Sequence, residues 1–120
     1  MVLIDTSIWI HHFRKQNPEL SRLLADGQIA MHSFVIGELR CGNLPMREQT
    51  LVDFGRLPSA PHALDREVYD LIENQKLMGL GIGFVDAHLL ASALLGALPL
   101  WTHDRRLREV AESLRCAYAP

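Results

Sequence analysis

The sequence predicts an α/β domain built on a parallel sheet that helices cover on both faces. Short apolar runs typical of buried strands alternate along the chain with longer segments in which apolar residues recur every three or four positions. This alternation favours a parallel sheet, because parallel strands are usually joined by helical crossovers. The 120 residues, 48% hydrophobic and 22% charged, suit one globular domain spanning the whole chain, residues 1–120.

The first predicted strand is the apolar run Val2–Ile4, which ends at Asp5. The hydroxyl residues that follow can cap a helix whose apolar positions continue to Phe13. Pro18 suits the first position of the next helix, and Gly27 suits the position just past its end.

Residues 28–32 are the second predicted strand, and Ser33 can cap a helix that contains Glu38. Glycine, asparagine and proline at positions 42–45 break this helix. A further helix is predicted over residues 46–57.

A weakly marked third strand is predicted over residues 60–64, followed by a helix that Asp65 caps. The glycine-rich segment 79–83 is a loop. It follows a helix instead of a strand, so it is not a dinucleotide-binding turn. Residues 84–96 form a strongly apolar helix with Asp86 near its start.

The fourth predicted strand is 98–102, Asp104 begins a basic helix over 105–114, and a fifth strand lies at 116–118. In such sheets a ligand site lies beyond the carboxyl ends of the strands, where the strand order reverses. Asp5 and Asp104 come just after the first and fourth strands, so we expect both at that edge.

Four acids stand out by their placement: Asp5, Glu38, Asp86 and Asp104. Asp5 follows three apolar residues and Asp86 lies on an apolar helix, although carboxylates are rarely buried unless paired or bound to a cation. Carboxylates that share a cleft repel one another, which a divalent cation such as Mg²⁺ or Mn²⁺ relieves. Each acid alone has an ordinary explanation as a cap, a turn or a solvated residue, but together they favour a shared site.

Other chemically active residues give weaker signals. None of the six histidines forms the two-histidine helical spacing of a zinc motif; His88 and His103 lie near acids, where a local structural role is the commoner one. Cys41 and Cys116 have no metal-type spacing. The net charge of -2 provides no general basic field, so phosphate contacts would come from local arginines.

Four segments occur in a fixed order: VLIDTSIWI (2–10), IGELRCG (36–42), GIGFVDAHLLASAL (81–94) and LWTHDRRL (100–107). Together they resemble the PIN-domain family, in particular the VapC toxins of bacterial toxin–antitoxin pairs. The resemblance implies a three-layer α/β/α domain with a five-stranded parallel sheet. It also implies endoribonuclease activity that depends on Mg²⁺ or Mn²⁺. His103 stands where the family often has Arg.

Position by position, the resemblance implies a catalytic quartet of Asp5, Glu38, Asp86 and Asp104. Asp5, Asp86 and Asp104 are the expected metal ligands, whereas Glu38 is as well suited to act through water. Thr6 and Thr102 are expected to orient the acids by hydrogen bonding. The candidates for holding the RNA backbone are Arg14, Arg40, Arg105 and Arg106, each of which is also consistent with ordinary solvated surface.

The resemblance also implies partners: an RNA substrate, a VapB-type antitoxin, a second copy of the chain in a homodimer, and DNA only indirectly through the antitoxin. An antitoxin could insert a basic side chain among the acids and lay an apolar helix in a groove nearby. Phe13 and Leu44 are candidates for that groove, whereas Trp9 suits the core better. We expect no membrane association and a cytoplasmic location, because the longest apolar run, Leu89–Trp101, is too short to span a bilayer.

Two other functions are compatible with parts of this pattern. A phosphoacceptor receiver domain needs paired acids after the first strand and a lysine after the fifth, but only Asp5 follows the first strand and neither lysine is at a strand end. The second alternative is a non-catalytic PIN-like module that acts in a DNA-bound repressor complex. The presence of all four acids argues against loss of catalysis.

Overall fold

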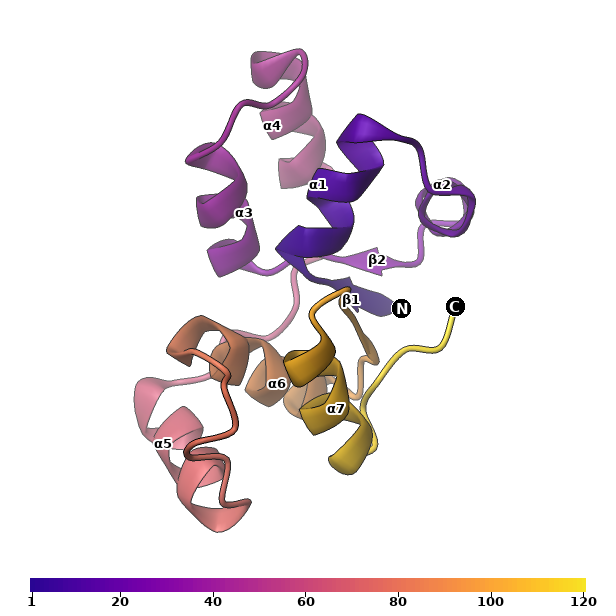
Figure 1. The fold of residues 1–120 in the computed structure, drawn as a ribbon. Helices are drawn as coiled ribbons and strands as arrows, with labels where there is room; N and C mark the ends of the chain where they lie inside the picture. The colour runs from indigo at the N-terminus through magenta and orange to yellow at the C-terminus, as the bar shows by residue number, and fades with distance from the viewer.

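The structure, a computed structural model, describes residues 1–120 and has a parallel sheet between two layers of helices (Figure 1). The strands are β1 (Val2–Ile4), β2 (Ile29–Ala30) and β3 (Leu100–Trp101), in the order β2-β1-β3. Both neighbours run parallel to β1, with Leu3 paired to Ala30 on one side and to Leu100 on the other.

The sheet has three strands where five were predicted. The third predicted strand is reduced to a single parallel bridge between Met31 and Ser59, just before the predicted range 60–64. Met31 N donates to Pro58 O (2.8 Å) and Ala60 N donates to Met31 O (2.9 Å). The ladder does not extend further because Pro58 has no N–H to donate toward β2 and because the chain enters α3 at Ser33, two residues after Met31.

The fifth predicted strand is likewise a single parallel bridge, between Leu100 and Ala117. Leu100 N donates to Cys116 O (2.7 Å), and Tyr118 N donates to Leu100 O (2.9 Å). These two bridges extend the sheet at both edges by one residue each, so two of the five predicted strands are reduced to single bridges.

All the predicted helices form. They are α1 (Thr6–Arg14), α2 (Pro18–Ala25), α3 (Ser33–Arg40), α4 (Arg47–Arg56), α5 (Asp65–Asn74), α6 (Phe84–Gly96) and α7 (Arg105–Ser113). Helices α1 to α4 lie on one face of the sheet and α5 to α7 on the other, which is the expected three-layer arrangement (Figure 1). No helix combines the length and apolar character needed to cross a membrane.

Burial on both faces explains why β1 is apolar at every position. Its three residues are buried between α1, whose Ile8 is in the core, and α6, whose Leu89 and Leu90 are fully buried. Trp9 is 2% exposed and packs edge-on against Phe54 with ring centroids 5.2 Å apart. Its place is therefore the core and not a surface groove.

The direction of winding changes at β1. From β1 the chain passes through β2 to the Ser59 bridge, then crosses to the other side of β1 and forms β3. The carboxyl ends of β1 and β3 consequently lie side by side, and Asp5 N donates to Trp101 O across them (2.9 Å). In doubly wound sheets, ligands bind at this kind of reversal point.

Candidate active site at the carboxyl ends of β1 and β3

Asp5 lies at the start of α1 but does not cap it. Its side chain is 7% exposed and makes no hydrogen bond to the helix backbone. Instead, Oδ2 accepts hydrogen bonds from Ser7 Oγ and from Thr102 Oγ1, both at 2.7 Å. These two hydroxyls hold one carboxylate oxygen, while Oδ1 has no hydrogen-bond partner within the protein and is free for a ligand.

The same hydroxyls join the segments that follow β1 and β3. Thr102 Oγ1 accepts a hydrogen bond from Asp104 N, and Ser7 Oγ accepts one from His103 N, both at 3.0 Å. Ser7 is the residue that sequence reasoning missed, since it was considered only as a helix cap. The available signal was its hydroxyl two residues after an acid, a spacing that favours local hydrogen bonding.

Asp104 is exposed and does cap its helix. Its Oδ1 accepts hydrogen bonds from the backbone N–H groups of Arg106 (2.9 Å) and Leu107 (3.1 Å) at the start of α7. The ordinary explanation as an N-cap is therefore correct for this oxygen. The other oxygen, Oδ2, makes no hydrogen bond within the protein.

Asp86 lies in the first turn of α6, where its Oδ2 accepts a hydrogen bond from Gly83 N (3.1 Å). Partial burial raises the pKa of Asp86, and the negative charges of Asp5, Asp104 and Glu38 raise it further, against the opposing effect of the Gly83 N–H. The four acids, which are up to 99 positions apart in the sequence, therefore share one electrostatic field.

Glu38 is exposed on α3. Its Oε1 accepts a hydrogen bond from Thr6 Oγ1 at 2.7 Å, which links α3 to the first residue of α1. Thr6 and Thr102 thus each bind one acid, Glu38 and Asp5 respectively.

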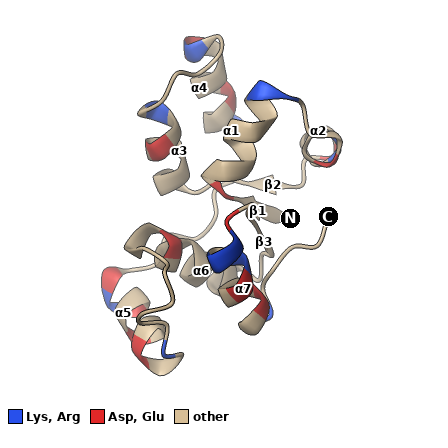
Figure 2. Cartoon of the chain, in the orientation of Figure 1, with Lys and Arg blue, Asp and Glu red and all other residues tan.

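The four acids lie near the same edge of the sheet, but their carboxylates do not converge on a single point. Figure 2 shows acidic positions where the chain leaves β1 and β3, next to basic positions at the start of α7. No three His, Cys, Asp or Glu side chains are arranged to hold a metal ion. The donor set nevertheless fits a hard divalent cation, because it consists of carboxylate oxygens whose mutual repulsion such an ion would relieve.

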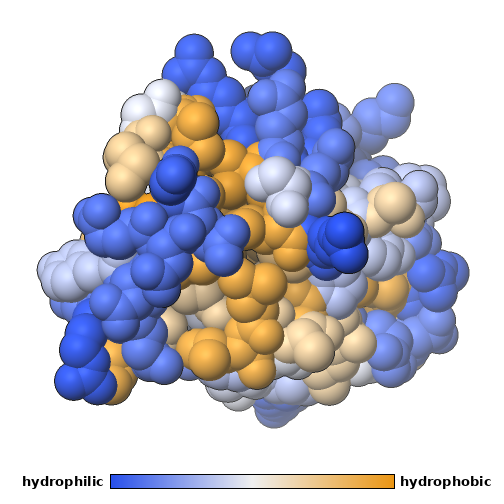
Figure 3. Space-filling view, turned by 90° about the horizontal axis from the view of Figure 1, so that it is seen from below, coloured by the Kyte–Doolittle hydropathy of each residue, from blue (hydrophilic) through white to orange (hydrophobic).

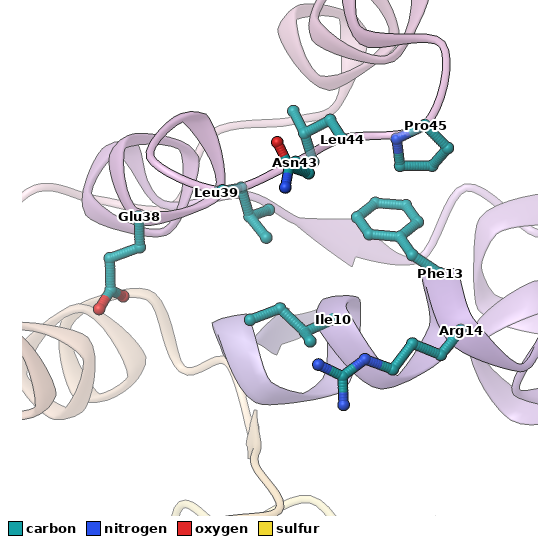
Figure 4. Close-up of a pocket in the computed structure, with 9 residues that line it drawn as sticks. Ile10, Phe13, Arg14, Glu38, Leu39, Asn43, Leu44 and Pro45 are labelled. Carbon is teal, nitrogen blue, oxygen red and sulfur yellow. The ribbon is translucent and has the colours of Figure 1, made fainter.

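The four candidate arginines differ in their relation to this edge. The Arg106 side chain lies against Gly81 in the loop before α6, where a Cβ would come within 2.5 Å of Arg106 Nη1. Arg14 lines a groove next to Glu38 (Figure 4). Arg105 makes only a long contact with Glu109 (3.8 Å). No contact ties the Arg40 side chain to the acids.

The groove beside Glu38 lies between α1 and the segment that follows α3. It has a volume of about 610 Å³, and its apolar lining includes Ile10, Phe13, Leu39 and Leu44 (Figure 4). Glu38 lies at one end of the groove with its carboxylate directed away from the apolar side chains, whereas the Arg14 side chain extends toward Ile10 (Figure 4). Phe13 and Leu44, the two groove candidates from the sequence, both line it.

The two histidines noted near acids have different surroundings. His88 is fully buried, with Nε2 3.0 Å from Asp65 Oδ1, so its partner is not one of the four acids. His103 is exposed and lies edge-on to His11, with ring centroids 5.3 Å apart. Burial and the nearby charges of His11 and Arg108 lower the pKa of His103, against the opposing charge of Asp5.

Comparison with known proteins identifies a matching family and a similar ribonuclease. The family model for the PIN domain matches residues 2–113. Ribonuclease VapC32 from two strains of Mycobacterium tuberculosis is 41% identical over 109 residues, which cover 90% of this chain and 88% of the relative.

Two solved structures share the fold. FitAcB from Neisseria gonorrhoeae has a TM-score of 0.63 at 22% identity, covering 93% of this chain and 94% of that one. PAE2754 from Pyrobaculum aerophilum has a TM-score of 0.60 at 18% identity, covering 94% and 85%. At these identities the likeness concerns the fold alone.

Proposed function

Because the chain belongs to the PIN-domain family and is similar to a VapC ribonuclease, we propose that it is an endoribonuclease that hydrolyses RNA phosphodiester bonds at the four acids. In this proposal it is a single PIN domain, residues 1–120, that acts in the cytoplasm as the toxin of a type II toxin–antitoxin pair. The observation that carries the proposal is Asp5, which two hydroxyls hold by one oxygen while the other oxygen stays free beside three further acids.

Asp5, Asp86 and Asp104 are the proposed ligands of Mg²⁺ or Mn²⁺. When bound, the cation neutralises charge on the scissile phosphate and acidifies water next to it. The protein orients the ligands: Ser7 and Thr102 hold Asp5, and the start of α7 holds Asp104 through its capping oxygen. Glu38, held by Thr6, is exposed and is placed to accept a proton from water.

RNA cleavage by purified variants tests the site. Asp5→Asn and Asp104→Asn should each abolish cleavage without unfolding the chain, since each change removes like-charge repulsion. The amide oxygen of Asn can still accept the hydroxyl bonds at position 5 and the capping bonds at position 104. Asp70→Asn, on the exposed side of α5, is the matched control and should cleave RNA as the wild type does. Wild-type cleavage by either site variant would show that the assignment is wrong.

Metal dependence is tested separately from cleavage. Millimolar Mn²⁺ should raise the melting temperature of the wild type through binding linkage, and EDTA should stop cleavage. The Asp5→Asn variant should lose most of the Mn²⁺ effect on melting. If neither cleavage nor a Mn²⁺ shift is seen, the chain is instead a non-catalytic PIN-like binding module.

The groove beside Glu38 is the proposed antitoxin site. Its apolar lining suits the apolar face of a partner helix, and the neighbouring acids suit a basic side chain from the same partner. Ile10→Glu should weaken binding of the antitoxin encoded in the adjacent reading frame, measured by titration calorimetry. The control Val52→Glu, half exposed on α4, should not. Equal affinities for both variants would exclude this groove.

A further inference from the structure

A second pocket adjoins the acids beyond β3. It has a volume of about 250 Å³ and lies between α2, the start of α7 and the C-terminal segment. It shares Thr102 and His103 with the active-site region, and Thr102 also donates its hydroxyl to Asp5. A ligand in this pocket would therefore lie next to Thr102, which itself binds Asp5, one of the proposed metal ligands.

The pocket carries an available positive charge. Arg108 lines it, and its only ionic contact is a long one from Nε to Glu112 Oε1 (3.7 Å), which leaves both terminal guanidinium nitrogens free. The acid in the lining, Glu19, is already paired, because Arg22 Nε and Nη2 donate to its two oxygens at 2.7 and 3.0 Å. Tyr118 donates its hydroxyl to the same carboxylate.

The lining also offers a ring face and an amide donor. The Tyr118 ring is half-buried, fixed at one end by the bond to Glu19 and packed against Trp101 with centroids 5.5 Å apart. Asn17 uses Oδ1 to cap α2 (2.9 and 3.1 Å), so its side-chain N–H₂ group has no partner within the protein. A held ring, an amide donor and a free guanidinium are the groups that bind unstacked bases and phosphates of single-stranded RNA.

We propose that this pocket binds one nucleotide of the RNA, next to the scissile phosphate, with Arg108 contacting a phosphate and Tyr118 stacking on the base. The inference rests on the proposed ribonuclease function and deepens it, because it makes the pocket a determinant of which nucleotide flanks the cleaved bond. Its size suits a single nucleotide better than a protein segment, and its free charge has the sign that a phosphate requires.

Cleavage of RNA randomised around the cut site, followed by sequencing of the product ends, tests the pocket. Arg108→Ala should raise KM about tenfold with kcat changed less than about twofold, because it removes a contact that substrate and transition state share. Tyr118→Leu should flatten the nucleotide preference at one position beside the cleaved bond. Tyr118→Phe keeps the ring and should keep the preference. Arg66→Ala, an exposed arginine on α5, is the control for loss of charge.

A measurement on the unaltered chain separates this inference from the function it rests on. Titration of the wild type with each nucleoside 5′-monophosphate, followed by NMR, should shift the signals of Tyr118, Arg108 and Asn17, with different affinities for the four bases. No shift at these residues, or folded Arg108→Ala and Tyr118→Leu variants with wild-type KM and cleavage profile, would overturn the proposal. Changed antitoxin affinity with unchanged RNA cleavage would also overturn it. A wild type that binds nucleotides here but cleaves no RNA would refute the nuclease function instead.

Discussion

At the scale of single residues, the four acids are held in four different ways. Two hydroxyls bind Asp5, the start of α7 binds Asp104, Gly83 N binds Asp86, and Thr6 binds Glu38. Each of the four acids retains one carboxylate oxygen without a hydrogen-bond partner in the protein, and both Glu38 and Asp104 are exposed. If one of the four does not contact metal directly, we expect it to be Glu38.

Thr102→Val should damage both the site and the fold. The substitution removes the hydroxyl that donates to Asp5 and accepts from Asp104 N, in a side chain that is 4% exposed. We expect a loss of about 1–3 kcal/mol in the free energy of unfolding, measured with urea. Cleavage should fall roughly 100-fold because Asp5 is no longer oriented. Thr50→Val, whose exposed hydroxyl donates only to Pro45 O, should change neither strongly.

Asp86→Asn should stabilise the chain at neutral pH while abolishing cleavage. Burial and three neighbouring acids raise the folded-state pKa of Asp86 above its unfolded value. Its protonated form therefore contributes stability that is present below the unfolded pKa and is lost as pH rises through the folded pKa. Melting curves in EDTA should show the variant above the wild type at pH 7, with the difference shrinking as pH falls through the raised pKa. A constant difference at all pH values would contradict this cause.

At the scale of elements, one contact joins the loop before α6 to the start of α7. Gly81 has φ +81°, and the Arg106 side chain occupies the space that a Cβ would need. This contact connects the N-terminal ends of α6 and α7, where Asp86 and Asp104 lie. The glycine-rich loop is therefore required for its backbone shape and for close approach of an arginine, and not for binding a dinucleotide.

Gly81→Ala should cost about 1–2 kcal/mol of stability, because it imposes both an unfavourable positive φ and a clash with Arg106. The double variant Gly81→Ala/Arg106→Ala should recover only the part due to the clash. Gly55→Ala on α4, where a Cβ meets nothing within 4 Å, is the control and should be neutral or slightly stabilising. Equal unfolding free energies for all three variants would contradict the contact.

At the scale of the whole molecule, the side formed by α5 to α7 exposes apolar side chains. Seen from this side, hydrophobic groups gather across the middle of the surface (Figure 3). The exposed apolar residues of α5, α6 and the loop between them include Tyr69, Met78, Phe84, Leu94 and Leu95. A large exposed apolar patch is typical of an interaction surface, and we propose that it forms the expected homodimer.

Leu95→Glu, at a leucine that is 55% exposed, should convert the dimer to a monomer in sedimentation velocity experiments. In a two-fold dimer each subunit would carry the substitution, so association would bury two unpaired carboxylates, which costs free energy. Val52→Glu is the control on the opposite helical layer and should leave the dimer intact. A wild type that sediments as a monomer at high micromolar concentration would contradict the proposal.

Much of the fold was predictable because its signals are local. Apolar runs, caps and breakers act over a few residues, and they located all the helices and the strands β1, β2 and β3. They also placed Asp5 and Asp104 at one edge, since Asp5 directly follows the first strand and Asp104 comes shortly after the fourth predicted strand. The two outer strands were overestimated because strand formation depends on a partner. One of them is limited to a single bridge by Pro58, which has no N–H, and by the start of α3 at Ser33.

The sequence by itself determined the α/β alternation and the order of the elements, and it singled out the four acids as candidates for the site. Only the tertiary structure decided that Ser7 and Thr102 bind Asp5. It also decided that Asp104 caps α7 with one oxygen, and that Arg108 and Tyr118 line a nearby pocket. The reason is distance along the chain. Thr102 meets Asp5 across 97 positions, and such a contact follows from how the layers pack, which no local pattern encodes.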